Sequence, residues 1–275
     1  MRKVDESKME RKFTEEWIPV TDLDVDPQIQ RFALNLRKVE RIKAAFNPQA
    51  LGVATVSRRN RVTNILLDGW HRKQVVAELT DNTGELLCHV FEGLTRAEEA
   101  QMFLDLNAGN QPGLLEKFRA RIIAGDPIAV GVDETTKAYG FVVGPMGGNA
   151  SISCVGALER IYRRSLDDEA EPNHLQMALL LVTRAWGVDR YATQAVILEG
   201  LASLWRVHTS NINVDRLVQK LSTYPGGPMG LHTDATAMAA LRRGQVNMAV
   251  AELAVNEYNK GPSKEKLPNW SRKRA

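Results

Sequence analysis

The sequence of 275 residues has few of the features that mark disulfide-bonded, zinc-binding, membrane or exported proteins. Its two cysteines, Cys88 and Cys154, lie far apart and belong to no Cys-x-x-Cys or Cys/His ligand pattern, so we expect buried thiols. No apolar run approaches the ~20 residues that a membrane span requires. The charged stretch MRKVDESKMERK contains no signal-peptide hydrophobic segment. We therefore expect a cytoplasmic protein without a membrane segment.

The whole sequence carries little net charge, but its positive charges are concentrated in two segments. The net charge is only +3 and 44% of the residues are hydrophobic, which suffices for one large domain or two modest ones. Between Arg37 and Lys73, however, nine Lys or Arg residues face two acidic ones, and between Lys260 and Ala275 six face one. Such clusters indicate an anionic partner, either nucleotide phosphates or a nucleic-acid backbone. A solvated basic face and a disordered tail are the alternative.

Apolar periodicity predicts mixed α and β structure in the first third of the chain. The runs LGVATVS and VTNILLD flank the polar turn RRNR, which is typical of a β-hairpin. The other elements expected here are a strand at 17–20, a loop ending at Arg31, a helix at 36–46 behind an Asn35 cap, a helix at 70–79 and a strand at 86–91.

Helical patterns dominate the rest of the chain. Thr95 and Glu98 form a capping box at the start of one helix, and the next helix ends at Gly125 before Asp126-Pro127. One short strand is expected at 139–143. The later helices are expected at 152–164, 173–186, 190–207, 213–223, 231–242 and 245–259.

These elements predict an α+β protein in which a small mixed N-terminal domain is followed by an all-α C-terminal part. We expect a flexible arm at 1–16, the mixed domain at 17–92, the helical part at 93–260 and a basic tail at 261–275. The helical part is a candidate for homodimerisation.

The stretch NILLDGWHRKQVV, from Asn64 to Val76, is the strongest candidate for a functional site. Its apolar strand ends on Asp68-Gly69, and a helix begins at Trp70. The first N–H groups of such a helix lack intrahelical acceptors and lie at the positive end of its dipole. Gly69 lets an anion approach closely, and Arg72 can offer two parallel donors to a phosphate. The corner therefore predicts a phosphate site.

His71 and Asp68 add groups that could support chemistry. His71 can donate a further hydrogen bond or act as a general acid or base. Asp68 disfavours an anion, so a functional Asp68 would hold a divalent ion such as Mg²⁺, orient His71 or Arg72, or accept a proton. In a purely structural interpretation, Asp68 caps the helix and Trp70 packs in the core.

Further polar residues are candidates for contacts with nucleic acid or nucleotide. Arg58, Arg59 and Arg61 of the turn, with Lys73, are candidates for a nucleic-acid backbone. In NAGNQPG, a segment between two helices, the polar residues either line a nucleotide site or form a capped turn; they are Asn107, Asn110 and Gln111.

Residues 17–79 resemble the N-terminal domain of the ParB and sulfiredoxin superfamily. The matching positions, in order, are Ile18-Pro19-Val20, Leu23, Arg31, Ile42, Leu51 and Asp68-Gly69-Trp70-His71-Arg72. The Asp-Gly-x-His-Arg form is similar to a branch frequent in actinobacterial and phage proteins described as ParB-like nucleases. The resemblance implies a ParB/sulfiredoxin-like domain in which Arg31, Gly69, Trp70, His71 and Arg72 bind phosphates.

The resemblance also implies cofactors and limits the chemistry. It implies a nucleoside triphosphate, CTP or ATP, and Mg²⁺ held by Asp68, with Asp68 and His71 catalytic in a nuclease, NTPase or kinase. Sulfiredoxins need a reactive cysteine where this chain has Trp70, so their sulfur chemistry is excluded. A non-enzymatic DNA-binding or assembly module, and a small-molecule kinase using a loop carboxylate from Asp22, Asp24 or Asp26, remain as alternatives.

Overall fold

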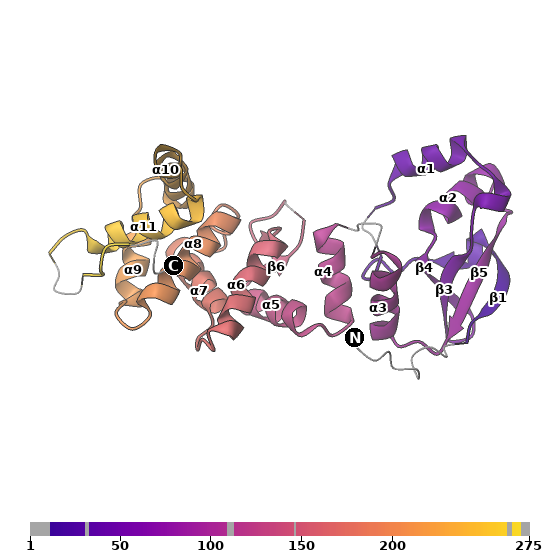
Figure 1. Cartoon of the computed structure of the whole chain (residues 1–275), viewed down its shortest axis with the longest axis horizontal. Helices are drawn as coiled ribbons and strands as arrows, with labels where there is room; N and C mark the ends of the chain where they lie inside the picture. Colours follow the sequence, from indigo (N-terminus) through magenta and orange to yellow (C-terminus); the bar gives the residue numbers. More distant parts are fainter. Residues whose placement is uncertain (1–11, 31–32, 109–112, 146, 263–265, 271–275) are drawn as a thin grey trace. The chain divides into compact units, whose positions relative to one another are not determined.

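The computed structural model describes residues 12–30, 33–108, 113–145, 147–262 and 266–270 (Figure 1). The chain forms two compact units, Met1–Asp126 and Pro127–Ala275. Among the described residues, no helix combines the length and the apolar character needed to cross a membrane.

The first unit is built on a five-stranded mixed sheet. Across the sheet the order is β1 (Thr14–Pro19), β5 (Glu85–Glu92), β3 (Ala54–Arg59), β4 (Thr63–Asp68) and β2 (Leu23–Asp24). The pairs β1–β5 and β3–β4 are antiparallel, whereas β3–β5 and β2–β4 are parallel. Strand β1 begins at Thr14, opposite Val90, so the end of the segment expected as a flexible arm is part of the sheet.

The hairpin predicted from LGVATVS and VTNILLD is confirmed as β3 and β4. Asn60 and Arg61 have φ angles of 50° and 65°, and the N–H of Val62 donates to the carbonyl of Arg59 at 3.2 Å. Two successive residues with positive φ are typical of a type I′ turn, whose twist suits an antiparallel pair.

Helices cover both faces of the sheet. On one face α2 (Trp70–Leu79) packs through Val76 against a buried cluster that includes Val56, Leu66 and Cys88. On the other face Ser57 and α3 (Arg96–Leu106) are joined by a buried hydrogen bond. Alternate residues of β3 thus face the two helices, as the strand period requires. Helix α1 (Leu36–Ala44) contacts α2, and α4 (Leu114–Ile123) contacts α3.

The first unit extends past the boundary expected at residue 92. Ile29, from the loop after β2, is fully buried with Ala100 and Phe103 of α3 and Ala120 of α4. This apolar cluster packs both helices against the loop after β2, and the first unit ends at Asp126.

The second unit is mostly helical. It contains α5 (Pro127–Ala138), β6 (Val142–Val143), β7 (Ser151–Ile152), α6 (Val155–Asp167), α7 (His174–Trp186), α8 (Ala195–His208), α9 (Val214–Ser222), α10 (Gly227–Arg242) and α11 (Val246–Asn259). The α+β class and the helical C-terminal part are confirmed. Strand β6 lies within the short strand expected at 139–143, whereas its parallel partner β7 was not expected.

Close helix packing holds the second unit together. At Gly200 of α8, a Cβ atom would lie 2.6 Å from the carbonyl oxygen of Asn247, so any larger residue would push α8 and α11 apart. Part of the segment expected as a tail is also packed: Leu267 is buried, and its backbone exchanges two hydrogen bonds with the Asn259 side chain.

Candidate functional site

The strand-to-helix corner has the predicted geometry. Strand β4 ends at Asp68, Gly69 has a φ of +112°, and α2 begins at Trp70 without a side-chain cap. A Cβ at Gly69 would lie 2.9 Å from the Cβ of Ala54, so glycine is required both by backbone conformation and by space. The first N–H groups of α2 therefore lie at a helix N-terminus whose N-cap residue, Gly69, has no side chain to accept them.

Arg72 is engaged within the protein. Its Nη1 donates to the carbonyls of Leu51 and Val53 at 3.2 and 2.9 Å, and its Nη2 donates to Oδ2 of Asp68 at 2.6 Å. The guanidinium thus fixes the segment before β3 to the corner. Of the roles expected for Asp68, orientation of Arg72 is the one that the contacts fit. Direct binding of phosphate by Arg72 stays a prediction, and it would require some of these bonds to be exchanged.

His71 is buried, and its Nε2 accepts a hydrogen bond from the backbone N–H of Asn35 at 3.3 Å. Because Asn35 also caps α1 with its side chain, this contact links the start of α1 to the corner. An accepting Nε2 places the proton of a neutral imidazole on Nδ1. General acid or base catalysis by His71 stays a prediction.

A small polar cavity lies directly at the corner. It has a volume of about 30 Å³ and is lined by Gln30, Lys38, Asp68, Gly69, Trp70, His71 and Asn107. That volume admits one water-sized group, such as a single phosphate oxygen. Trp70 also packs against the apolar core, so its structural interpretation is correct as well.

Three residues of this cavity come from elements distant in sequence. The Gln30 amide donates to the carbonyls of Leu66 and Leu67, which fixes the loop after β2 against β4. Asn107, at the end of α3, also lines the cavity, and its contact with a nucleotide stays a prediction. Lys38 of α1 is half-buried, and its ammonium has no partner among the described residues. Asn110, Gln111 and Arg31, also predicted for this site, lie outside the described residues.

Sequence reasoning did not single out Gln30 or Lys38. Lys38 was one of several charges on a basic helix, and its only distinguishing signal is its place one turn after the Asn35 cap, which His71 contacts. Gln30 directly precedes the predicted phosphate residue Arg31, but a neutral amide in a loop carries no signal of its own.

The basic residues predicted to contact a nucleic-acid backbone mostly have partners inside the protein. Arg58 forms two hydrogen bonds to the carboxylate of Glu16 on β1, at 3.0 and 2.6 Å. Lys73 donates to the carbonyl of Leu23 at 2.6 Å and so holds β2. Arg61 is exposed at the turn and has no partner among the described residues. Nucleic-acid binding by these residues stays a prediction, and Arg61 is the one whose charge is available for it.

Arg59 belongs to a buried ionic network between the sheet and α3, which we call the Glu99 network. Glu99 is fully buried, accepts from the Ser57 hydroxyl at 2.7 Å and pairs with Arg59. Arg59 also donates to Asp26 at 3.0 Å, and Arg96 donates to the same carboxylate oxygen. The Glu99 hydrogen bond, with Asp26 nearby, raises the pKa of Arg59. Asp26, one of the loop carboxylates considered for catalysis, thus has a structural role.

The stability of the protein should depend on pH through Asp26. Burial raises its pKa, but hydrogen bonds from Gln28, Arg59 and Arg96 outweigh burial, and the net pKa lies below the usual value. A carboxyl with a depressed folded-state pKa stabilises the fold above its unfolded-state pKa, and this contribution is lost as pH falls through the folded-state value. Asp26→Asn, which can keep the bond from Gln28, should flatten acid destabilisation below about pH 4 in thermal melts. Equal acid slopes in the two proteins would contradict this.

Neither cysteine has the properties of a reactive thiol. Both are free, and burial raises the pKa of Cys88 and of Cys154 to about 11. A thiol with that pKa is almost entirely protonated at neutral pH and is a poor nucleophile. The prediction of a buried thiol is confirmed for Cys88, whereas Cys154 is partly exposed.

The corner offers one carboxylate for a metal ion. In the part of the chain that the structure describes, no three His, Cys, Asp or Glu side chains are grouped as metal ligands. Asp68 is 44% exposed, and one of its oxygens bonds Arg72. Since Mg²⁺ commonly uses one or two carboxylates together with substrate phosphates and water, Asp68 alone is compatible with such an ion.

Comparisons with known proteins give a family and related solved structures. No curated protein matches the chain. A solved structure described as "Structure of the pNOB8-like ParB N-domain" is similar at 14% identity with a TM-score of 0.37, covering 87% of this chain and 94% of that one. The model of a family of unknown function, DUF6551, matches residues 27–269. The chain belongs to the family DUF6551.

Proposed function

We propose that the protein binds a phosphate-bearing ligand, a nucleotide or DNA, at the corner between β4 and α2. The observation that carries this proposal is the cavity at the N-terminus of α2, where the N-cap Gly69 offers no side-chain acceptor, beside the half-buried side chain of Lys38. Helix N–H groups and an unpaired ammonium favour the same ligand charge. Since the cavity admits only one oxygen, the nucleoside or the rest of the backbone would lie outside it.

The residues around this cavity have distinct roles in the proposal. Lys38 and the first N–H groups of α2 contact the phosphate, whereas Arg72 and Gln30 hold the backbone that shapes the cavity. Arg31 and Arg72 remain candidates for additional phosphate contacts. The nucleotide would be CTP or ATP, and Mg²⁺ on Asp68 would neutralise phosphate charge.

Phosphoryl transfer is the reaction class that these groups would support. A nuclease, an NTPase and a small-molecule kinase all need positioned phosphates and a group that handles a proton. His71 can take the second role once the N–H of Asn35 is released from its Nε2. A DNA-associated, phage-borne protein and a homodimer formed by the helical unit are further parts of this proposal.

The exposed turn of the hairpin favours a second candidate function, which is non-enzymatic binding of a nucleic-acid backbone. A hollow of about 380 Å³ there is lined by Arg58, Arg59, Asn60, Arg61, Glu92, Gly93, Leu94 and Arg96. A protein of this kind would lose DNA affinity steeply with salt and would not turn over a nucleotide.

Replacing Lys38 tests the first candidate. CTP, ATP, ADP and short DNA are titrated by calorimetry with Mg²⁺ at low salt, and product formation is followed in parallel. We expect Lys38→Ala to lower the affinity for the ligand that binds by about tenfold, because one charge-assisted hydrogen bond is lost. Arg37→Ala is the matched control, since Arg37 is exposed on the same helix and does not line the cavity.

Two results would contradict the proposal. One is a wild-type protein that binds no nucleotide and no DNA. The other is an equal effect of Lys38→Ala and Arg37→Ala on affinity. Lys38 would then act only through the overall surface charge and not through contact with the ligand in the cavity.

A further inference from the structure

The helical unit contains a second, larger basic cavity. It lies between α6, α8 and the turn that joins α10 to α11, and its volume is about 850 Å³. We call it the arginine groove and define it by its polar lining residues Arg160, Arg163, Arg164, Arg206, Gln245 and Asn247. A cavity of this volume is in the range of sites that bind whole small molecules.

Positive charge predominates in the arginine groove. Four arginines line it together with two acidic residues, Asp167 and Glu199. Glu199 is already engaged, because it accepts from Arg160 at 2.6 Å and from the Asn247 amide at 3.2 Å. Arg163 and Arg164 are exposed, and neither pairs with any described residue. Two guanidinium groups are therefore available to an anionic ligand.

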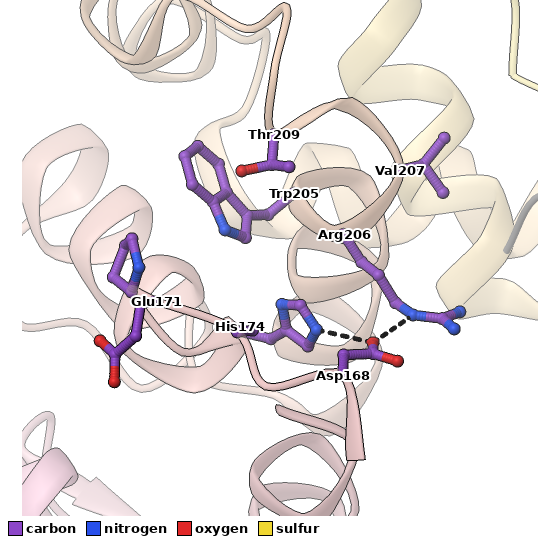
Figure 2. A pocket seen from close by; sticks show the side chains of 9 residues that line it. Asp168, Glu171, His174, Trp205, Arg206, Val207 and Thr209 are labelled. Atoms are coloured by element: carbon purple, nitrogen blue, oxygen red, sulfur yellow. Dashed lines mark hydrogen bonds and ion pairs between the residues drawn. The ribbon is translucent and has the colours of Figure 1, made fainter. Parts of the chain in front are cut away.

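Two residues that line the groove, His174 and Arg206, are held by contacts with Asp168, which belongs to a neighbouring pocket that both residues also line (Figure 2). Asp168 accepts from Nε of Arg206 at 2.6 Å and from Nε2 of His174 at 3.0 Å, and these bonds lower the pKa of Asp168. Figure 2 shows Arg206 of α8 and His174 of α7 converging on this carboxylate. His174 also lines the groove, and its side chain is only 6% exposed. Its Nδ1 has no hydrogen-bond partner among the described residues.

The N-terminus of α11 adds donors to the same groove. Gln245 is the N-cap residue, but its side chain accepts no hydrogen bond from the helix. The next two residues, Val246 and Asn247, line the groove. The N–H groups of these first helical residues have no acceptor within the helix and lie at the positive end of its dipole. Planar guanidinium forks and helix N–H groups together match the several oxygens of a phosphate.

We propose that the arginine groove is a binding site for a phosphate ester, separate from the corner in the first unit. The phosphate would contact Arg163, Arg164 and the first N–H groups of α11, with Arg206 held in place by Asp168. A free nucleotide and a nucleic-acid backbone supply the same chemistry. The site is defined by residues of the helical unit alone and does not rest on the function proposed for the corner.

The test compares two double variants of the full chain. Arg163→Ala with Arg164→Ala removes both available guanidinium groups. Arg184→Ala with Arg190→Ala is the matched control, because both of these arginines are exposed in the same unit and do not line the groove. Pyrophosphate and ATP are titrated by calorimetry, and a short fluorescent DNA by anisotropy at two salt concentrations.

We expect the groove variant to bind at least one phosphate probe about tenfold more weakly or worse, while the control stays near wild type. If the groove variant loses binding of pyrophosphate and ATP, the ligand of the groove is a free nucleotide. If it loses only DNA binding, and the slope of log affinity against log salt concentration falls by about one to two, the ligand is a nucleic-acid backbone. Arg163→Gln with Arg164→Gln, which keeps long side chains, repeats the test if the alanine variant is unstable in thermal melts.

Unchanged affinity for every phosphate probe in the groove variant would overturn the proposal. So would a wild-type protein that binds none of them. Groove-dependent binding of a polyglutamate peptide without any phosphate probe would also overturn it, because the groove would then select carboxylates.

Discussion

Replacing Glu99 with alanine is expected to destabilise the protein by about 3–5 kcal/mol, the cost typical of removing one partner from a buried ion pair. Glu99 is fully buried and binds both Arg59 and Ser57. Without it, the Ser57 hydroxyl loses its acceptor, and Arg59 keeps only the carboxylate of Asp26. Urea unfolding followed by circular dichroism would measure the change.

Asp105→Asn is the matched control for Glu99, because Asp105 is exposed on the same helix and its side chain bonds only Gln101 among the described residues. Removal of an exposed charge should change stability by less than about 1 kcal/mol. If Glu99→Ala cost no more than this control, the Glu99 network would not hold α3 on the sheet.

Replacing Gly69 with alanine should have the second large effect. The new side chain would meet the Cβ of Ala54 at 2.9 Å, and the backbone would keep a φ of +112°. Backbone strain of about 1–2 kcal/mol and overpacking of about 1–3 kcal/mol give an expected loss of roughly 2–5 kcal/mol. Thermal and urea unfolding would measure it.

Gly93→Ala separates the two causes. Gly93 has a φ of +71°, but nothing lies within 4 Å of the position of its Cβ. It should therefore cost only the backbone strain, about 1–2 kcal/mol. Equal losses at Gly69 and Gly93 would show that the close approach of β3 to the corner does not constrain the chain.

Features set by neighbouring residues could be predicted from the sequence. The β3–β4 hairpin, the capping box of Thr95 and Glu98 and the change from strand to helix at Gly69 all depend on residues a few positions apart. Local propensity and short-range periodicity carry that information.

Proline and glycine gave ambiguous signals at two helix starts. Asp126-Pro127 was interpreted only as the end of a helix, yet Pro127 is also the first residue of α5. The helix expected at 231–242 begins earlier, as α10 at Gly227, with a proline in its first turn. Proline lacks an N–H that the first turn of a helix does not use, so it can end one helix and begin the next.

The partner of each arginine could not be predicted. Arg59, Arg61 and Arg72 look alike in sequence, but Arg59 pairs with a residue of α3 and Arg72 with two backbone carbonyls and Asp68. Arg61 alone of the three is exposed. Only the fold brings those acceptors together, and it therefore decides which positive charges remain for a ligand.

The pairing of β1 with β5 determines the order in which the sheet can assemble. Thr14 lies opposite Val90, so β1 has no partner until the chain as far as β5 has been synthesised. Strands β3 and β4 need only a short turn and can pair earlier, because closing a short loop costs less entropy. The first strand of the chain is thus the last to join the sheet on the ribosome, and until then the outer edge of β5 is open to other chains.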